Sequence, residues 1–175
     1  DDAGGSLLQE LPEGTILLSD AYQVGKPMTR WFALVSEIAE AVDDVQRFGS
    51  RLNSLGLNSI IVAQDTHEFV GLCLPMCLTH LDTPRGDMSL AGVDCCFAAP
   101  EIQGYVEHPA GPAADVYALA VLTYSLLAGE PPRDLVECNF CPVTEHLDLG
   151  PSLTRCLEDS LAMVPERRPR SASQI

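Results

Sequence analysis

Positive charge is scarce in this sequence of 175 residues. Ten lysines and arginines stand against 25 aspartates and glutamates, which gives a formal net charge of −15. A surface this acidic repels nucleic-acid phosphates and anionic lipid headgroups, so binding of either through a basic patch is excluded. Apolar runs are short as well. None approaches the roughly 20 residues of a membrane-spanning helix, because Thr123, Tyr124 and Ser125 interrupt the longest candidate, residues 117–128.

The sequence also lacks the marks of secretion. It begins with acidic and small residues, whereas a signal peptide begins with basic and then apolar residues. The absence of an initial Met predicts a processed or partial chain. Seven cysteines are too few for a disulfide scaffold of this length. We therefore expect free thiols in a reducing, intracellular compartment, with the cytoplasm as the first choice.

Hydrophobic periodicity predicts one mainly helical domain. Apolar residues recur every three or four positions in two amphipathic helices, and a third helix is apolar nearly all round, which is typical of a buried central helix. A short buried strand and an antiparallel partner form one small β-hairpin. We expect loops on both sides of this hairpin. The predicted bounds are 31–48, 114–128 and 151–163 for the helices, 59–63 and 68–74 for the strands, and 50–58 and 75–98 for the loops.

Two segments carry a resemblance to a known family. Ala-Pro-Glu at residues 99–101 is followed by Ala-Asp-Val-Tyr-Ala-Leu from residue 114, and Pro-Glu-Arg-Arg-Pro-Arg-Ser occupies residues 165–171. In this order and spacing they resemble the Ala-Pro-Glu motif, the central helix and the closing element of protein kinases. The resemblance implies a mainly α, protein-kinase-like C-terminal lobe with one small β-hairpin over residues 31–175. Residues 1–30 are then a lead-in and hinge-like segment.

The resemblance extends backward to the catalytic positions. Residues 51–58 stand where the family has His-Arg-Asp-Leu-Lys-Pro-Glu-Asn, and the Asp-Phe-Gly motif would begin 13 residues later. The match places Asn53 at the catalytic Asp and Leu55 at the Lys of the loop. It places Asn58 at the metal-binding Asn and Gly71 at the magnesium-binding Asp.

Three of these four positions have lost the chemistry that phosphoryl transfer needs, which is charge held in place. The amide of Asn53 cannot take a proton, the side chain of Leu55 is inert, and Gly71 has no side chain. A shift of the match by one or two residues restores little, because no Asp lies between Ser50 and Gln64. The N-terminal lobe, with its Gly-rich phosphate loop, is expected to be absent from this chain. The resemblance therefore implies a pseudokinase with no cofactor and no catalytic residues.

Other positions keep the residues of the family. Glu101 and Arg168 match a buried ion pair between the Ala-Pro-Glu motif and the closing element. Asp115 matches the residue that accepts hydrogen bonds from the backbone of the catalytic loop. An ordinary N-cap at the start of the central helix is the alternative for Asp115. We expect all three residues to be structural.

The cysteines permit a different interpretation. A Cys-x2-Cys pair, a nearby histidine and a later cysteine could form a zinc site of three sulfurs and one imidazole. The candidates are Cys138, Cys141, His146 and Cys156, with Cys73, Cys77 and His80 as a looser second set. One Cys-x2-Cys pair without a second is an unspecific signal, so ordinary thiols and no bound metal are expected.

Acidic residues gather on the helix predicted at 31–48. A solvated helix face is the plain expectation, and contact with a basic partner is the functional alternative. The residues are Glu37, Glu40, Asp43 and Asp44. His67 and His108 lie in polar turns and are expected to be solvated.

Together these observations favour a catalytically inactive, kinase-like module that acts as a scaffold or regulatory interaction subunit. Its partners would be proteins in a larger assembly. Two alternatives stay open. One is the C-terminal lobe of an active kinase whose other lobe lies outside this chain, and the other is a zinc-stabilised helical interaction domain.

Overall fold

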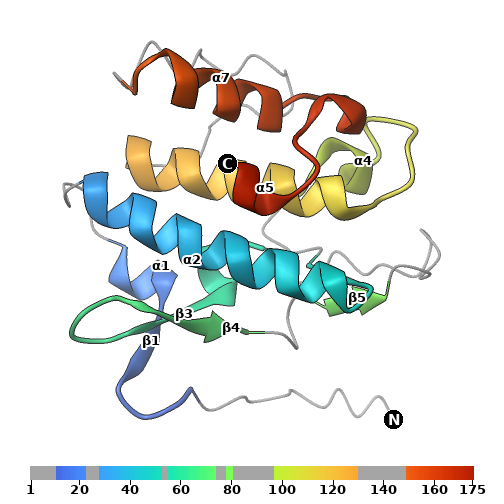
Figure 1. Ribbon diagram of the computed structural model, residues 1–175. Coiled ribbons are helices and arrows are strands. Elements are labelled where there is room, and N and C mark those ends of the chain that lie inside the picture. The colour runs from blue at the N-terminus through green and yellow to red at the C-terminus, as the bar shows by residue number, and fades with distance from the viewer. Residues whose placement is uncertain (1–10, 23–27, 53–54, 74–77, 81–96, 130–148) are drawn as a thin grey trace, which may run out of the picture.

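The computed structural model describes residues 11–22, 28–52, 55–73, 78–80, 97–129 and 149–175 (Figure 1). Its longer helices are α2 (Met28–Arg47), α5 (Pro112–Ala128) and α7 (Pro151–Ser160). They run side by side with α5 in the middle, and a small antiparallel sheet lies beyond α2 and α5 (Figure 1). Among the described residues, no helix has both the length and the apolar character to span a bilayer.

Helix α5 is the central buried helix that the sequence predicts. Pro112 occupies its first turn, and Gly129 ends it with a left-handed φ of 85°, a conformation that favours glycine. Every residue from 114 to 126 is buried. The hydroxyls of Thr123 and Ser125 donate to the carbonyls of Leu119 and Val121, at 2.8 and 2.7 Å. The helix therefore contains polar residues in the core without leaving their hydroxyls unpaired.

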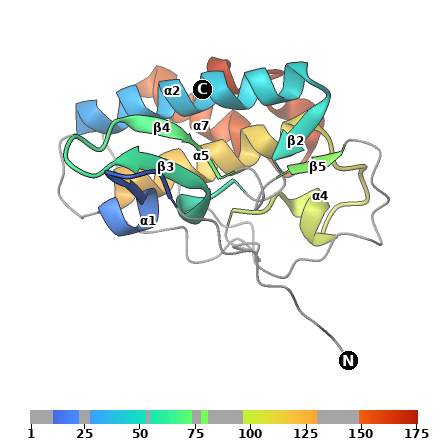
Figure 2. The same cartoon turned by 90° about the horizontal axis from the view of Figure 1, so that it is seen from below.

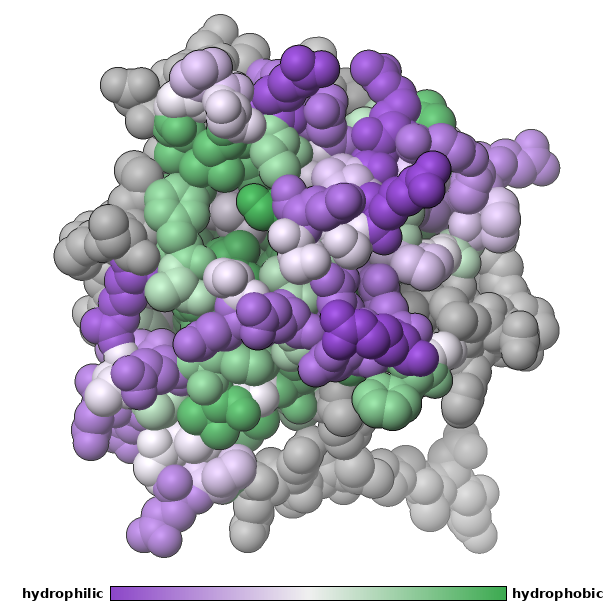
Figure 3. Space-filling view, in the orientation of Figure 1, coloured by the Kyte–Doolittle hydropathy of each residue, from purple (hydrophilic) through white to green (hydrophobic). Residues whose placement is uncertain are grey.

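Helix α2 covers one side of α5 with an apolar face. Its core residues recur at the spacing of an amphipathic helix, and they are Trp31, Leu34, Val35, Ile38, Ala39 and Val42. The helix starts three residues before the predicted bound and ends just ahead of Gly49, whose φ is 74°. Figure 3 shows hydrophilic side chains across the outer surfaces of α2 and α7. One face of α2 therefore belongs to the core, and the opposite face is a polar surface.

The predicted hairpin is present and belongs to a larger sheet. Strand β3 (Ile60–Ala63) pairs antiparallel with β4 (Phe69–Leu72), and Ile61 lies opposite Gly71. Strand β1 (Thr15–Leu17) pairs with the other edge of β3, which gives the order β1-β3-β4 (Figure 2). The hairpin alone would leave β3 as an edge, and β1 closes that edge.

A second, two-stranded sheet lies where loops were predicted. Strand β2 (Ser50–Leu52) pairs antiparallel with β5 (Leu78–His80). The prediction of plain loops at 50–58 and 75–98 was wrong at these two places. Strands of three residues are too short to show a period in the sequence, and their pairing joins segments far apart in the chain.

The segment before residue 31 is not a mere lead-in. Helix α1 (Leu18–Ala21) buries Leu18 and Ala21, which are 0% and 2% exposed. The hydroxyl of Tyr22 donates to the carbonyl of Ser125 on α5, at 2.7 Å. The boundary at residue 31 therefore does not separate two parts, because residues from both sides of it build one core.

The closing part of the chain contains short helical turns. Helix α4 (Pro100–Gln103) begins at the predicted Ala-Pro-Glu motif, and α7 ends at Ser160, ahead of the predicted residue 163. Two 3-10 turns follow, η3 (Pro165–Arg167) and η4 (Ala172–Gln174). The last of them packs against α2.

Asp43 fixes this last turn to α2. Its carboxylate accepts hydrogen bonds from the backbone N–H groups of Ala172 and Ser173, at 2.8 and 3.2 Å. The residue is 8% exposed, so the expectation of a solvated acidic face was wrong for Asp43. Glu37, Glu40 and Asp44 are exposed as expected. The first N–H groups of a helical turn have no partner within the turn, and Asp43 supplies one from another helix.

We expect Asp43→Asn to lower the free energy of unfolding by about 1 kcal/mol at pH 7, as for the loss of a helix cap. Burial alone would raise the pKa of Asp43, but hydrogen bonds from the Ser173 side chain and from the two backbone groups, with Arg47 nearby, hold that pKa below its ordinary value. A lowered folded-state pKa stabilises the fold above the unfolded pKa of about 3.9. The difference between variant and parent should therefore shrink as pH falls through the folded-state pKa.

Urea denaturation between pH 7 and pH 2.5 measures this effect. Asp44→Asn is the matched control, because Asp44 is exposed and pairs with Arg47 on the helix surface. The control should change the free energy of unfolding by about 0.5 kcal/mol or less. An Asp43→Asn effect that stays constant over this pH range would contradict the assigned role.

Candidate functional site

The buried ion pair between Glu101 and Arg168 is present. The Nη1 and Nη2 atoms of Arg168 donate to Oε1 and Oε2 of Glu101, at 2.7 and 2.9 Å. The two side chains are 0% and 1% exposed. This is the bidentate arrangement for which the planar guanidinium is suited.

Arg168 makes further contacts that the sequence did not predict. Its remaining donors reach the carbonyls of Ala162, Ala113 and Met163, at 2.8, 3.0 and 3.2 Å. All five N–H groups of the guanidinium are therefore paired. The guanidinium carbon also lies 4.9 Å from the centre of the Tyr117 ring. The arginine thus joins α4, α5 and the end of α7 at one buried point.

Asp115 fixes the start of α5 to Leu52, in the stretch 51–58 that the resemblance matches to the catalytic loop, and this is the contact expected of it. Its Oδ1 accepts from the backbone N–H of Leu52 at 3.0 Å, and its Oδ2 accepts from Nε2 of Gln46 at 2.9 Å. The residue is fully buried. The N-cap of α5 is Gly111, four positions earlier, so the alternative of an N-cap role for Asp115 was wrong.

Three of the four positions assigned to catalysis lie within the described residues, and Asn53 lies outside them. Leu55 is 0% exposed within the core, Asn58 is exposed on the 3-10 turn η1 (Leu57–Ser59), and Gly71 lies inside β4. Leucine is commonly buried, so the position of Leu55 in the core is compatible with a family lysine that an apolar residue replaces. The backbone N–H of Leu52, the second residue of the matched stretch 51–58, donates to Asp115, which is the contact that the match predicts for the catalytic loop.

Ser59 is a structural residue that the sequence reasoning missed. Its hydroxyl accepts from the backbone N–H of Gly56 and donates to the carbonyl of Gly56, both at 2.8 Å. A Cβ at Gly56 would lie 3.3 Å from the Phe97 ring, which makes this a close approach. The available signal was a small polar residue directly before an apolar strand. Ser59 and Gly56 give the loop before β3 its compact turn.

The zinc candidates are not brought together by the described part of the chain. Cys138, Cys141, His146 and Cys77 lie outside it, and the side chain of His80 is not described. The Cys156 thiol donates to the carbonyl of Gln174 at 3.2 Å, and burial raises the pKa of that thiol. Cys73 is a buried thiol. Within the described residues, no group of three metal-binding side chains occurs.

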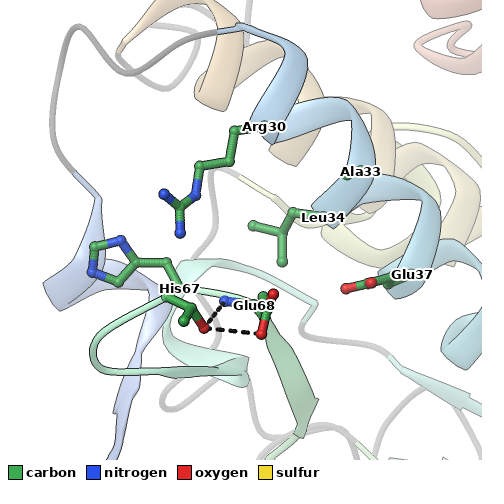
Figure 4. A pocket seen from close by; sticks show the side chains of 7 residues that line it. Arg30, Ala33, Leu34, Glu37, His67 and Glu68 are labelled. Atoms are coloured by element: carbon green, nitrogen blue, oxygen red, sulfur yellow. Dashed lines mark hydrogen bonds between the residues drawn. The ribbon is translucent and has the colours of Figure 1, made fainter.

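A cleft of about 520 Å³ opens between α2 and the turn that joins β3 to β4 (Figure 4). Leu34 forms its apolar floor, and charged side chains stand around it. The lining residues are Arg30, Ala33, Leu34, Glu37, Thr66, His67 and Glu68. His67 is half-buried with a left-handed φ of 55°, so the expectation of a solvated His67 was too simple. The Thr66 hydroxyl donates to Glu68 at 3.0 Å and shapes the turn.

His108 is also not simply solvated. Its Nε2 lies 2.7 Å from Oε1 of Glu166, and its Nδ1 lies 2.8 Å from the carbonyl oxygen of Pro109. The imidazole therefore joins the segment after α4 to the turn η3. No local pattern in the sequence indicates this contact, because His108 and Glu166 are 58 positions apart.

Solved structures identify the architecture. The kinase domain of PknI from Mycobacterium tuberculosis superposes with a TM-score of 0.64 and 20% sequence identity, over 90% of this chain and 56% of that domain. A double mutant of the same domain gives the same TM-score and identity, over 91% and 58%. No protein-family model matches the sequence. The chain therefore has a protein kinase-like fold, and it spans little more than half of the kinase domains that it matches.

Proposed function

We propose that this chain is part of a catalytically inactive, protein-kinase-like module that acts as a scaffold or regulatory interaction subunit. The residues that hold the fold together are present and paired, above all Glu101 with Arg168 and Asp115 with Leu52. The charged residues that phosphoryl transfer would need are replaced. A fold that keeps its internal contacts while it lacks catalytic charge favours binding over catalysis.

The observation that carries this proposal holds if the match is shifted by one or two residues. No acidic residue occurs from Ser50 to Gln64, and none occurs from Phe69 to Leu81. These two stretches include the loop before β3 and the chain after β4. Phosphoryl transfer requires carboxylates that hold magnesium and orient the attacking hydroxyl. A shift of one or two residues in either direction therefore restores neither carboxylate.

The expected partner is a protein with a basic surface. The net charge of −15 and the exposed carboxylates of Glu37, Glu40, Asp44 and Glu68 support this choice. Such a surface attracts cationic partners and speeds their encounter, with an effect that falls as salt rises. The cleft beside Glu37 and Glu68 adds an apolar floor at Leu34, where a side chain of the partner could pack.

Magnesium and ATP should not stabilise the intact protein. A ligand that binds the folded state must raise its stability by mass action, by about 2.7 kcal/mol at 100 times its dissociation constant. We therefore expect no change in the melting temperature when about 5 mM ATP and about 10 mM magnesium are added. Differential scanning fluorimetry measures this directly.

A phosphorylation assay on the full-length protein separates this proposal from the alternative of an active kinase. With radiolabelled ATP and a generic basic substrate, incorporation should equal that of a heat-denatured sample. A kinase with its second lobe elsewhere in the full-length protein would instead transfer phosphate. That result, reproduced after removal of co-purifying kinases, would overturn the proposed function.

A further inference from the structure

We propose that the contact between His108 and Glu166 is a proton-dependent regulatory contact, which holds the segment 104–111 against the turn η3 when His108 is protonated. Such a contact goes beyond the proposed interaction function, because it would control one surface of the module. The inference rests on the position of the two ring nitrogens and on the segments that they join.

Both ring nitrogens of His108 face atoms that accept hydrogen bonds. Nε2 lies 2.7 Å from a carboxylate oxygen of Glu166, and Nδ1 lies 2.8 Å from the carbonyl oxygen of Pro109. A neutral imidazole carries one N–H and can satisfy one of these acceptors. The other nitrogen would then present a lone pair to an oxygen lone pair. The imidazolium ion, with two N–H groups, is the form that fits this geometry.

The contact lies beside the buried ion pair and joins the same two parts of the chain. Glu101 and His108 come from α4 and the segment after it, whereas Arg168 and Glu166 come from η3 and its end. The inner pair is fully buried, but the side chains of His108 and Glu166 are 32% and 63% exposed. Loss of the proton would therefore release the outer segment while the inner pair keeps the fold together.

The charges around His108 favour its protonated form. The hydrogen bond to the Pro109 carbonyl raises the pKa of His108, burial opposes this, and Glu166 and Glu101 add to the increase. A hydrogen bond from its own backbone N–H, and then the bond to His108, lower the pKa of Glu166, with Arg168 contributing. Glu107 and Arg167 are exposed neighbours.

These directions define the pH range in which the contact is formed. Because the pKa of His108 is raised in the folded protein, protonated His108 stabilises the contact below the unfolded-state pKa of about 6.5, and this stabilisation is lost as the pH rises through the folded-state pKa. Because the pKa of Glu166 is lowered, ionised Glu166 stabilises the contact above the unfolded-state pKa of about 4.3. The contact is therefore fully formed between about pH 4.3 and 6.5 and opens at higher pH. The released segment carries Tyr105, which is 54% exposed, so the surface offered to a partner changes with pH.

Imidazole nitrogen NMR of the intact protein tests the inference. Both ring nitrogens of His108 should show imidazolium shifts up to a pH above the ordinary midpoint of histidine. Glu166→Gln should move the midpoint of His108 to lower pH and leave that of His67 unchanged. An unchanged His108 midpoint in Glu166→Gln, or a neutral ring at pH 6, would overturn the proposal.

Hydrogen exchange tests the structural consequence. The amides of Tyr105 and His108 donate to the carbonyls of Pro100 and Val106. Their exchange, corrected for the intrinsic pH dependence, should accelerate as pH rises through the His108 midpoint. In Glu166→Gln this extra acceleration should be lost, and protection should be low at all pH values. Equal protection in parent and variant across the range would show that the contact holds nothing in place, and would overturn the proposal.

Discussion

Replacing Arg168 with Ala will lower the free energy of unfolding by roughly 3–5 kcal/mol, which is the usual cost of removing one partner of a buried ion pair. The variant leaves the carboxylate of Glu101, 1% exposed, without its counter-charge. It also removes the donors to three backbone carbonyls. Urea denaturation followed by circular dichroism measures the loss. The variant will be unfolded without urea if the free energy of unfolding of the parent is smaller than this loss.

Two further variants make this prediction specific. Arg167→Ala is the matched control, because Arg167 is exposed and should change the free energy of unfolding by about 0.5 kcal/mol or less. The double variant Glu101→Leu/Arg168→Met removes both charges, so its cost should be smaller than the sum of the two single losses. It will not be neutral, because the three carbonyls still lose their donors. Additive losses in the double variant would contradict a coupled pair.

Central features of this fold could be predicted because they leave a local pattern. Residues 114–126 are mostly apolar, with Gly129 three positions after them, and every residue of this stretch is buried in α5. The pairing of Glu101 with Arg168 has no local pattern at all. It came from the resemblance to protein kinases, since two residues that are 67 positions apart meet only through the fold.

Features that depend on contacts between distant segments could not be predicted from the sequence. Strands β2 and β5 contain three residues each, so neither shows an alternating period. The sequence predicts Asp43 as part of an acidic helix face, because the turn that it binds lies 129 positions later. It predicts a solvated His108 for the same reason. In each case the sequence shows the type of side chain, but the partner depends on how distant segments pack together.

The candidate catalytic positions show a different limit. The resemblance places Leu55 where the family has a lysine, and the fold buries Leu55 completely, as an apolar side chain favours. The sequence tells which side chain replaces a family residue, but the place where the replacement packs depends on the fold. The proposal about catalysis depends on the residue types that are missing around these positions.

Replacing Asp115 with Ala should lower the free energy of unfolding by about 3 kcal/mol or more. The carboxylate is fully buried and accepts from the backbone N–H of Leu52 and from the Gln46 side chain. A hydrogen bond to a charged group contributes about 1.5–3 kcal/mol, and the buried N–H of Leu52 would be left without this acceptor. Asp115→Asn should cost less, because the amide keeps one acceptor for Leu52. Gln46→Ala, which leaves the Leu52 contact intact, should cost about 1 kcal/mol.

Amide exchange gives this prediction a local readout. The amide of Leu52 should exchange much faster in Asp115→Ala than in the parent, by more than the change in global stability explains. In Gln46→Ala it should stay protected, because Oδ1 of Asp115 still accepts from it. The contact fixes Leu52, the last residue of β2, to the central helix, so its loss should loosen the chain at Leu52 while α5 stays formed. Equal stability of parent and Asp115→Ala, with a protected Leu52 amide, would show that this carboxylate does not hold Leu52 to the central helix.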